Sequence, residues 1–313
     1  MSEATSTKIE PNALIEFLAW VHSESHSEEL TVIQSEVLER LKLTPAPAAR
    51  AIVLSGQRVA GAYFTCLPGR LAILGAVRTI TQHEQLGSRL LVELATELSH
   101  EYKVELVQAA VADVDFAAQQ MLEAAGFRYL ATVDQMWLSP IVATSIDDAT
   151  QGQQHSAWQP RWTDMSEVAE ANFLTLLEST FQESLDCPEL NNLRSIRDVL
   201  DSFLLGRRFS ELKNWRVAWE GRRMIGCLIL EEHENSVSEI VYMGLAPSAR
   251  HRGMGKQLVG QAVERALSQG LSGVALAVDM RNVPAIKTYV RCGFRPLRRL
   301  KVYLIRSGKP HAA

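Results

Sequence analysis

The sequence predicts an α/β protein with two tandem copies of one domain, each a mixed, mostly antiparallel sheet with helices on both faces. Two repeated features favour a duplication: Gly87 and Gly255 lie 168 positions apart, and Gly126 and Gly293, each followed by Phe, lie 167 apart. A nearly constant offset is typical of an internal repeat. The length of 313 residues also suits two domains of ordinary size, each able to bury its own core.

Each copy is expected to contain two helices, three antiparallel strands, a helix, a strand, a short helix and a last strand. A hairpin is predicted in both copies, because Ser55-Gly56 and Glu220-Gly221 each separate two apolar runs. In the second copy the other elements are expected at 165–181, 193–205, 255–268, 274–279, 284–291 and 300–305. The apolar pattern is interrupted from Ile141 to Trp158, so the linker is placed there.

A glycine-bearing loop stands between a predicted strand, Glu239 to Leu245, and an amphipathic helix, and it reads Arg250-His251-Arg252-Gly253-Met254-Gly255. Glycines at a helix start allow a tight turn and let an anion approach the backbone N–H groups. The loop therefore predicts a pyrophosphate site. Two other phosphate loops are excluded by spacing, because a dinucleotide fingerprint needs glycine at Leu258 and a Walker loop needs Ser or Thr at Gln257.

A second signature runs from Asn282 to Tyr289 and is followed by Cys292-Gly293-Phe294. Asn282 is placed to cap a short helix, Pro284 suits the first turn, and Gly293 suits the position after its end. By itself, a tyrosine at this spacing is usually an amphipathic core residue with its hydroxyl at the rim.

Together the two motifs resemble the GNAT superfamily of acyl-CoA-dependent N-acyltransferases. The shared pattern is Arg/Gln-x-x-Gly-x-Gly/Ala after a strand that ends Leu245-Ala246-Pro247, and then Asn-x-x-Ala-x-x-x-Tyr-x-x-x-Gly-Phe. The resemblance implies that the strand before the loop splays from its neighbour and that acyl-pantetheine inserts between them. It implies acetyl-CoA as co-substrate, without a metal. The two-copy layout resembles that of mycothiol synthases, whose catalytic half is also carboxy-terminal.

The chemistry of acyl transfer requires two proton carriers. An alkyl amine with a pKa of about 10 must lose a proton at neutral pH, which costs on the order of 4 kcal/mol, and the departing thiolate gains one. The resemblance implies that Glu239 is the general base, that Tyr289 is the general acid, and that the backbone N–H near Leu245 contacts the oxyanion. Without that family context, a Glu at the start of a strand is usually a solvated edge residue.

The resemblance, with the cluster of positive charge around the loop, also predicts the residues that bind the cofactor: Leu245, Arg250, His251, Arg252, Gly253, Met254, Gly255, Lys256 and Asn282. The basic residues among them would otherwise form a plain solvated face. His233, beside three glutamates, is interpreted either as a proton relay or as an exposed hairpin tip. A metal site is not expected there, because no second His lies at ligand spacing.

The first copy lacks the residues of this chemistry. At the same offsets, Glu239 corresponds to Leu71, Gly253 to Gln85 and Tyr289 to Leu122. We therefore expect a degenerate, non-catalytic domain over residues 1–145 and a catalytic domain over residues 156–313.

Composition excludes several other classes. The net charge of −4 gives no sign of a nucleic-acid partner. The amino-terminal apolar run, Leu14 to Val21, is too short to span a bilayer and contains Glu16, so a cytoplasmic location and no membrane partner are expected. The scattered cysteines, Cys66, Cys187, Cys227 and Cys292, are typical of reduced structural thiols.

The acceptor is expected to be a small-molecule or peptide amine, bound by a monomer or dimer. By the family resemblance the segment from Thr180 to Glu189 shapes the acceptor site, and its carboxylates at Glu183, Asp186 and Glu189 favour a cationic acceptor, although loop charges are usually solvated. The alternative is an acyl-CoA-binding sensor or scaffold without turnover. Such a protein would need only the phosphate loop, and the presence of Glu239 and Tyr289 therefore favours the enzyme.

Overall fold

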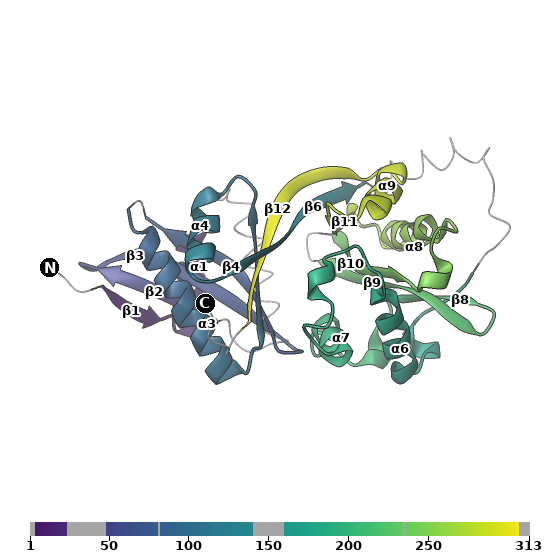
Figure 1. Ribbon diagram of the computed structural model, residues 1–313, viewed down its shortest axis with the longest axis horizontal. Coiled ribbons are helices and arrows are strands. Elements are labelled where there is room, and N and C mark those ends of the chain that lie inside the picture. Colours follow the sequence, from purple (N-terminus) through teal and green to yellow (C-terminus); the bar gives the residue numbers. More distant parts are fainter. Residues whose placement is uncertain (1–3, 24–47, 81, 140–159, 234–235, 307–313) are drawn as a thin grey trace. The chain divides into compact units, whose positions relative to one another are not determined.

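The computed structural model describes residues 4–23, 48–80, 82–139, 160–233 and 236–306 (Figure 1). It divides into two compact units: Met1–Ala131 with Leu300–Ala313, and Thr132–Arg299. Both units combine a mixed sheet with helices, as the sequence predicts. The predicted linker from Ile141 to Trp158, and the predicted second helix of the first copy, lie mostly or wholly outside the described residues.

The first unit has the strand order β1-β2-β3-β4-β5-β12, antiparallel except for β4 and β5. Its elements are β1 (Thr5–Lys8), a 3-10 turn (Pro11–Ala13), α1 (Leu14–Val21), β2 (Ala48–Leu54), β3 (Gln57–Leu67), β4 (Leu71–Thr79), α3 (Glu84–Tyr102), β5 (Leu106–Ala112) and α4 (Phe116–Ala124). Successive side chains of β3 point to opposite faces. Phe64 packs in the core with Leu94 of α3, and Tyr63 packs with Phe17 of α1.

The second unit has the strand order β6-β11-β10-β9-β8-β7. Its elements are β6 (Arg128–Leu138), β7 (Arg161–Thr163), α6 (Glu170–Phe181), α7 (Ile196–Leu204), β8 (Arg216–Glu220), β9 (Arg223–His233), β10 (Val237–Leu245), α8 (Met254–Ser268), β11 (Gly273–Asp279) and α9 (Val283–Arg291), with 3-10 turns at Met165–Glu167, Pro188–Leu190, Phe209–Glu211 and Pro247–Ala249. The chain then continues into β12 (Arg295–Arg306), whose residues from Leu300 belong to the first unit. Leu258 of α8 and Tyr289 of α9 share one core cluster with Ile240. Phe173 of α6 and Leu200 of α7 belong to another cluster.

Each copy gives its last strand to the sheet of the other unit. β12 pairs antiparallel with β5 from Leu300↔Ala112 to Arg306↔Leu106, and β6 pairs antiparallel with β11 from Val274↔Leu138 to Asp279↔Val133. The compact units therefore differ from residues 1–145 and 156–313. The sequence pattern does not reveal this exchange, because the two copies have the same fold and their last strands suit either sheet.

The predicted elements of the second copy are present, with small shifts at their ends. The first helix begins at Glu170 rather than 165, because Asp164 accepts a hydrogen bond from the Ser166 N–H at 2.9 Å and starts a separate 3-10 turn. Both predicted hairpins form, as β2–β3 and β8–β9. The four cysteines are free thiols. Among the described residues, no helix is both long and apolar enough to cross a membrane.

The retained glycine of each copy lies where the long helix contacts the short one. A Cβ on Gly255 would lie 3.2 Å from Cγ2 of Thr288, and a Cβ on Gly87 would lie 2.3 Å from Sδ of Met121. Thr288 and Met121 are themselves 167 positions apart, so the same helix contact occurs in both copies. Close helix packing therefore explains why Gly87 is present in a copy that lacks Gly253's counterpart.

Candidate active site

The two central strands of the second unit separate partway along their length. β10 and β11 pair in parallel from Val237↔Gly273 to Ile240↔Leu276, although β10 continues to Leu245 and β11 to Asp279. A β-bulge between Ile240 and Tyr242 interrupts the register of β10 with β9 at the same level. A bulge increases local twist, which favours this separation.

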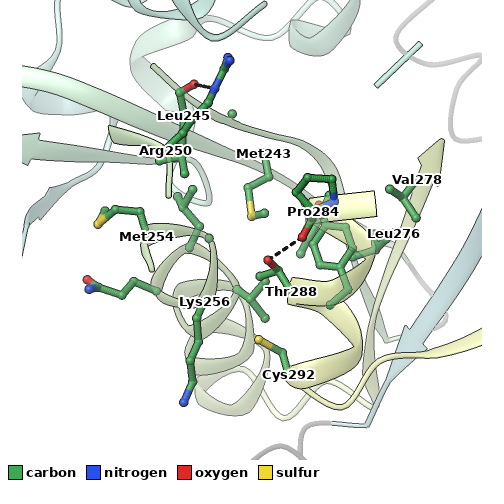
Figure 2. A pocket seen from close by; sticks show the side chains of 18 of the residues that line it. Met243, Leu245, Arg250, Met254, Lys256, Leu276, Val278, Pro284, Thr288 and Cys292 are labelled. Atoms are coloured by element: carbon green, nitrogen blue, oxygen red, sulfur yellow. Dashed lines mark hydrogen bonds between the residues drawn. The ribbon is translucent and has the colours of Figure 1, made fainter. Parts of the chain in front are cut away.

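An open cavity of about 1660 Å³ begins where the strands separate (Figure 2). Its walls come from β10, β11, most of the length of α8 and α9, and the loop after α6. Most of the predicted site residues line it: Leu245, Arg250, His251, Gly253, Met254, Gly255, Lys256, Asn282 and Tyr289. In the described ranges, no cluster of His, Cys, Asp and Glu is arranged to hold a metal ion.

The N–H of Leu245 is directed toward this opening. The N–H of the next residue, Ala246, donates to the carbonyl of Ile225 at 2.9 Å on the β9 side. Backbone N–H and C=O groups alternate in direction along a strand, so those of Leu245 point to the other side, from which β11 has separated. Consistent with that direction, Nε of Arg250 donates to the Leu245 carbonyl at 3.1 Å (Figure 2).

The loop before α8 has the backbone geometry that the sequence predicts. Gly253 is the N-cap of α8 with φ +78°, a conformation that disfavours side chains, and His251 also has a positive φ of 61°. The first N–H groups of a helix have no partner within that helix, and the helix dipole gives this end a partial positive charge. The amino-terminal end of α8 thus presents backbone donors and partial positive charge on the cavity wall.

The two arginines of the loop have protein partners. The guanidinium of Arg250 donates to the carbonyls of Thr180 at 3.1 Å and Gln182 at 2.6 Å, which ties this loop to the segment after α6. Arg252 pairs with Glu220 at 2.7 Å and lies outside the set of described residues that line the cavity. Contact of either arginine with a phosphate stays a prediction.

Helix α9 places a tyrosine on the cavity wall. Oδ1 of Asn282 accepts the N–H of Ala285 at 3.3 Å, which confirms the predicted N-cap, and Pro284 lies in the first turn. Tyr289 is 7% exposed and its ring lies 5.7 Å from that of Phe294. Burial raises the pKa of the Tyr289 phenol, and the nearby charge of Asp186 raises it further. The phenol is therefore protonated at neutral pH.

Comparison with known proteins identifies this segment. Residues 177–294 match the acetyltransferase (GNAT) family. This segment is a GNAT acetyltransferase domain. It is similar to the uncharacterized N-acetyltransferase YvbK of Bacillus subtilis, with 28% identity over 32% of this chain and 60% of that protein. A mycothiol acetyltransferase of Corynebacterium glutamicum is 32% identical over 24% of this chain and 26% of that protein. The chain thus matches only part of the length of these relatives.

Solved structures extend the likeness to the whole chain. A GCN5-related N-acetyltransferase from Sphaerobacter thermophilus aligns over 98% of this chain and 96% of its own, with a TM-score of 0.66 and 16% identity. A tandem GNAT protein from the clavulanic acid biosynthesis pathway aligns over 99% of this chain and 100% of its own, with a TM-score of 0.58 and 13% identity. These likenesses show the fold, which is that of a tandem GNAT protein.

Glu239 of the GNAT domain is paired rather than directed into the cavity. Its carboxylate lies 2.8 Å from Nε2 of His233, and the side chains are 40% and 20% exposed respectively. Glu239 lies beside Glu231 across the β9–β10 ladder, outside the described residues that line the cavity. Of the two interpretations of His233, a simple exposed hairpin tip fits less well, because the ring is mostly covered.

Sequence reasoning missed the position of Asp186 in the GNAT domain. This residue of the loop after α6 lines the cavity, and its Oδ1 accepts the N–H of Asp279 at 2.9 Å. The Asn282 side chain also hydrogen-bonds it. The carboxylate is open to the cavity, yet the protein atoms that surround it raise its pKa above the usual value for Asp. The only signal in the sequence was a run of loop carboxylates, which did not distinguish Asp186 from its neighbours.

Proposed function

We propose that this protein is an N-acetyltransferase that moves an acetyl group from acetyl-CoA to a primary amine by direct attack. The observation that carries the proposal is the separation of β10 and β11 beside the amino-terminal end of α8, within a GNAT domain. An extended pantetheine arm can pair with the exposed edge of β10 while its pyrophosphate reaches the helix amides. The lining residues supply both kinds of contact.

In the proposed reaction the amine nitrogen attacks the thioester carbonyl carbon, the new C–N bond forms, and the C–S bond breaks. The N–H of Leu245 donates to the oxygen that becomes negative, a role supported by its direction toward the opening. Glu239 takes the amine proton, acting with His233 because the two side chains are in contact. Tyr289 gives a proton to the departing thiolate.

The amino-terminal copy is proposed to perform no chemistry. The positions that correspond to the base and the acid hold Leu71 and Leu122, and both side chains are buried. Gln85, at the start of α3, stands where the second copy has Gly253. Binding of acetyl-CoA without product on any primary amine would instead support the sensor interpretation of the whole chain.

Replacing Glu239 with Gln should lower kcat/KM about 10²- to 10⁴-fold, because general-base assistance is lost. Acetyl-CoA affinity should stay nearly unchanged. His233→Gln, which breaks the same contact, should give a similar loss if the pair acts together. Rates of CoA release from both variants measure this, and wild-type rates for both would exclude the pair from catalysis.

Replacing both Gly253 and Gly255 with Val should abolish acetyl-CoA binding measured by calorimetry. A side chain at Gly253 is strained at φ +78°, and one at Gly255 presses on Thr288. The matched control is Gly260→Ala in the same helix, where an added Cβ meets nothing within 4 Å. Unchanged affinity in a folded double variant would contradict the assigned pyrophosphate site.

A further inference from the structure

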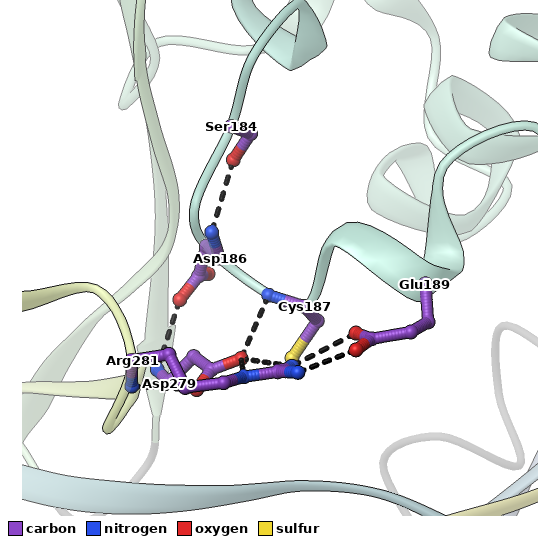
Figure 3. Close-up of polar contacts among 6 residues, drawn as sticks. All are labelled: Ser184, Asp186, Cys187, Glu189, Asp279 and Arg281. Atoms are coloured by element: carbon purple, nitrogen blue, oxygen red, sulfur yellow. Dashed lines mark hydrogen bonds and ion pairs between the residues drawn. The ribbon is translucent and has the colours of Figure 1, made fainter.

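Polar contacts hold the loop after α6 against the end of β11 (Figure 3). Asp279, the last residue of β11, is 1% exposed, and its Oδ2 accepts the N–H of Cys187 at 3.1 Å. The guanidinium of Arg281 contacts the Asp279 carboxylate at 2.7 Å and also binds the carboxylate of Glu189. The loop is therefore anchored immediately after Asp186, at Cys187 and Glu189.

These contacts hold Asp186 in place without neutralising the negative charge of its carboxylate. Its own N–H donates to Oγ of Ser184 at 3.2 Å, and its Oδ1 accepts the N–H of Asp279. Asn282 completes the set, because its Oδ1 caps α9 and its amide group can donate to Asp186. A carboxylate has about four lone-pair sites, so these two donors leave acceptor capacity on the side that faces the cavity.

The guanidinium of Arg281, the cation near Asp186, pairs with other carboxylates. Arg281 divides its contacts between Asp279 and Glu189, and it acts on Asp186 only through the attraction of their charges. Glu183, a third acid of this segment, has an exposed side chain. A negative charge on a cavity wall that the protein does not neutralise favours a ligand of opposite charge.

We propose that Asp186 binds the acceptor as a primary alkylammonium and selects cationic amines, an inference that rests on the proposed acetyl transfer. Asp186 and Tyr289 line the same cavity, and the influence of the Asp186 charge on the phenol indicates that they are near one another. An ammonium group on Asp186 is thus held at the end of the cavity where the proton donor of the reaction lies. Acceptors that carry such an alkylammonium group include polyamines, aminoglycosides and lysine side chains.

The competing explanation is that Asp186 only anchors the loop. Asp186→Asn separates the two, because the amide oxygen still accepts the Asp279 N–H while the charge is lost. The matched control is Glu178→Gln, which removes one negative charge from the exposed face of α6, the helix that leads into this loop. Spermidine, kanamycin and a lysine-containing peptide serve as probe acceptors.

Calorimetry on the CoA-loaded protein, with CoA release measured in parallel with acetyl-CoA, gives the decisive comparison. Asp186→Asn should weaken probe binding and raise the acceptor KM about tenfold or more, with acetyl-CoA affinity unchanged. Glu178→Gln should change neither. Probes that bind the wild-type protein through Asp186 but are not acetylated would contradict the proposed function alone. Unchanged probe binding in Asp186→Asn, or no binding of any probe to the wild-type protein, would overturn the role of Asp186.

The pH dependence tests the same inference without a substitution. The carboxylate is charged above its pKa, which burial raises, so acceptor KM should rise as pH falls through a range above the usual Asp value. The amine stays protonated in that range and does not cause the change. Other charged or titratable groups near Asp186 are Asp279, Arg281, Glu189, Cys187, Tyr242 and Tyr289. A wild-type KM with the same pH profile as that of Asp186→Asn would count against the proposal.

Discussion

Tyr289→Phe should lower kcat about 10²- to 10⁴-fold while acetyl-CoA affinity stays nearly unchanged, because only the proton donor of the reaction is removed. The ring packs in the core beside Phe294, and phenylalanine keeps this packing. Burial raises the pKa of the phenol, so Tyr289 stays protonated well above neutral pH and should not itself limit activity on the alkaline side.

Steady-state release of CoA at saturating acceptor measures this loss. Tyr303→Phe is the matched control, because Tyr303 is a core residue of the first unit whose phenol donates to the exposed Glu123. It should leave kcat unchanged. A wild-type kcat for Tyr289→Phe would mean that the thiolate is protonated by water or leaves without a proton.

Local interactions explain the parts of the site that the sequence predicts correctly. The cap at Asn282 depends on residues within one turn of α9, and the positive φ at Gly253 depends on the turn before α8. Interactions that span only one helical turn can be predicted from a short run of residues. The same holds for the hairpins, whose turns are set by two residues each.

The parts that were missed depend on contacts between distant segments. Asp186 becomes distinctive only because its carboxylate meets the N–H of Asp279, 93 residues later. The contact of His233 with Glu239 crosses a hairpin in which three other glutamates lie beside His233, so the pattern alone left two interpretations open. Conversely, the sequence indicates only that Gly87 is the counterpart of Gly255, and the contact of its helix with Met121 gives it a packing role.

The strand exchange also depends on contacts between distant segments. It determines which segment of the chain can be expressed alone. An expressed segment of residues 156–313 keeps β11 but loses β6, whose Met136 and Leu138 are buried in the same core as Leu276. It also carries residues 300–306 without β5, which leaves Tyr303 outside its core. An unpaired strand of this kind is a template for aggregation.

Residues 156–313 alone should therefore fail to fold, whereas residues 128–299, which contain all of the second unit, should fold cooperatively. Loss of a large core side chain costs about 2–5 kcal/mol. Two such losses, together with the β6 ladder, approach the whole stability of a domain, about 5–15 kcal/mol. Circular dichroism melts and gel filtration of the two segments provide the measurement. A soluble, cooperatively melting 156–313 segment would mean that β12 can return to pair with β11, so that each copy can complete its own sheet.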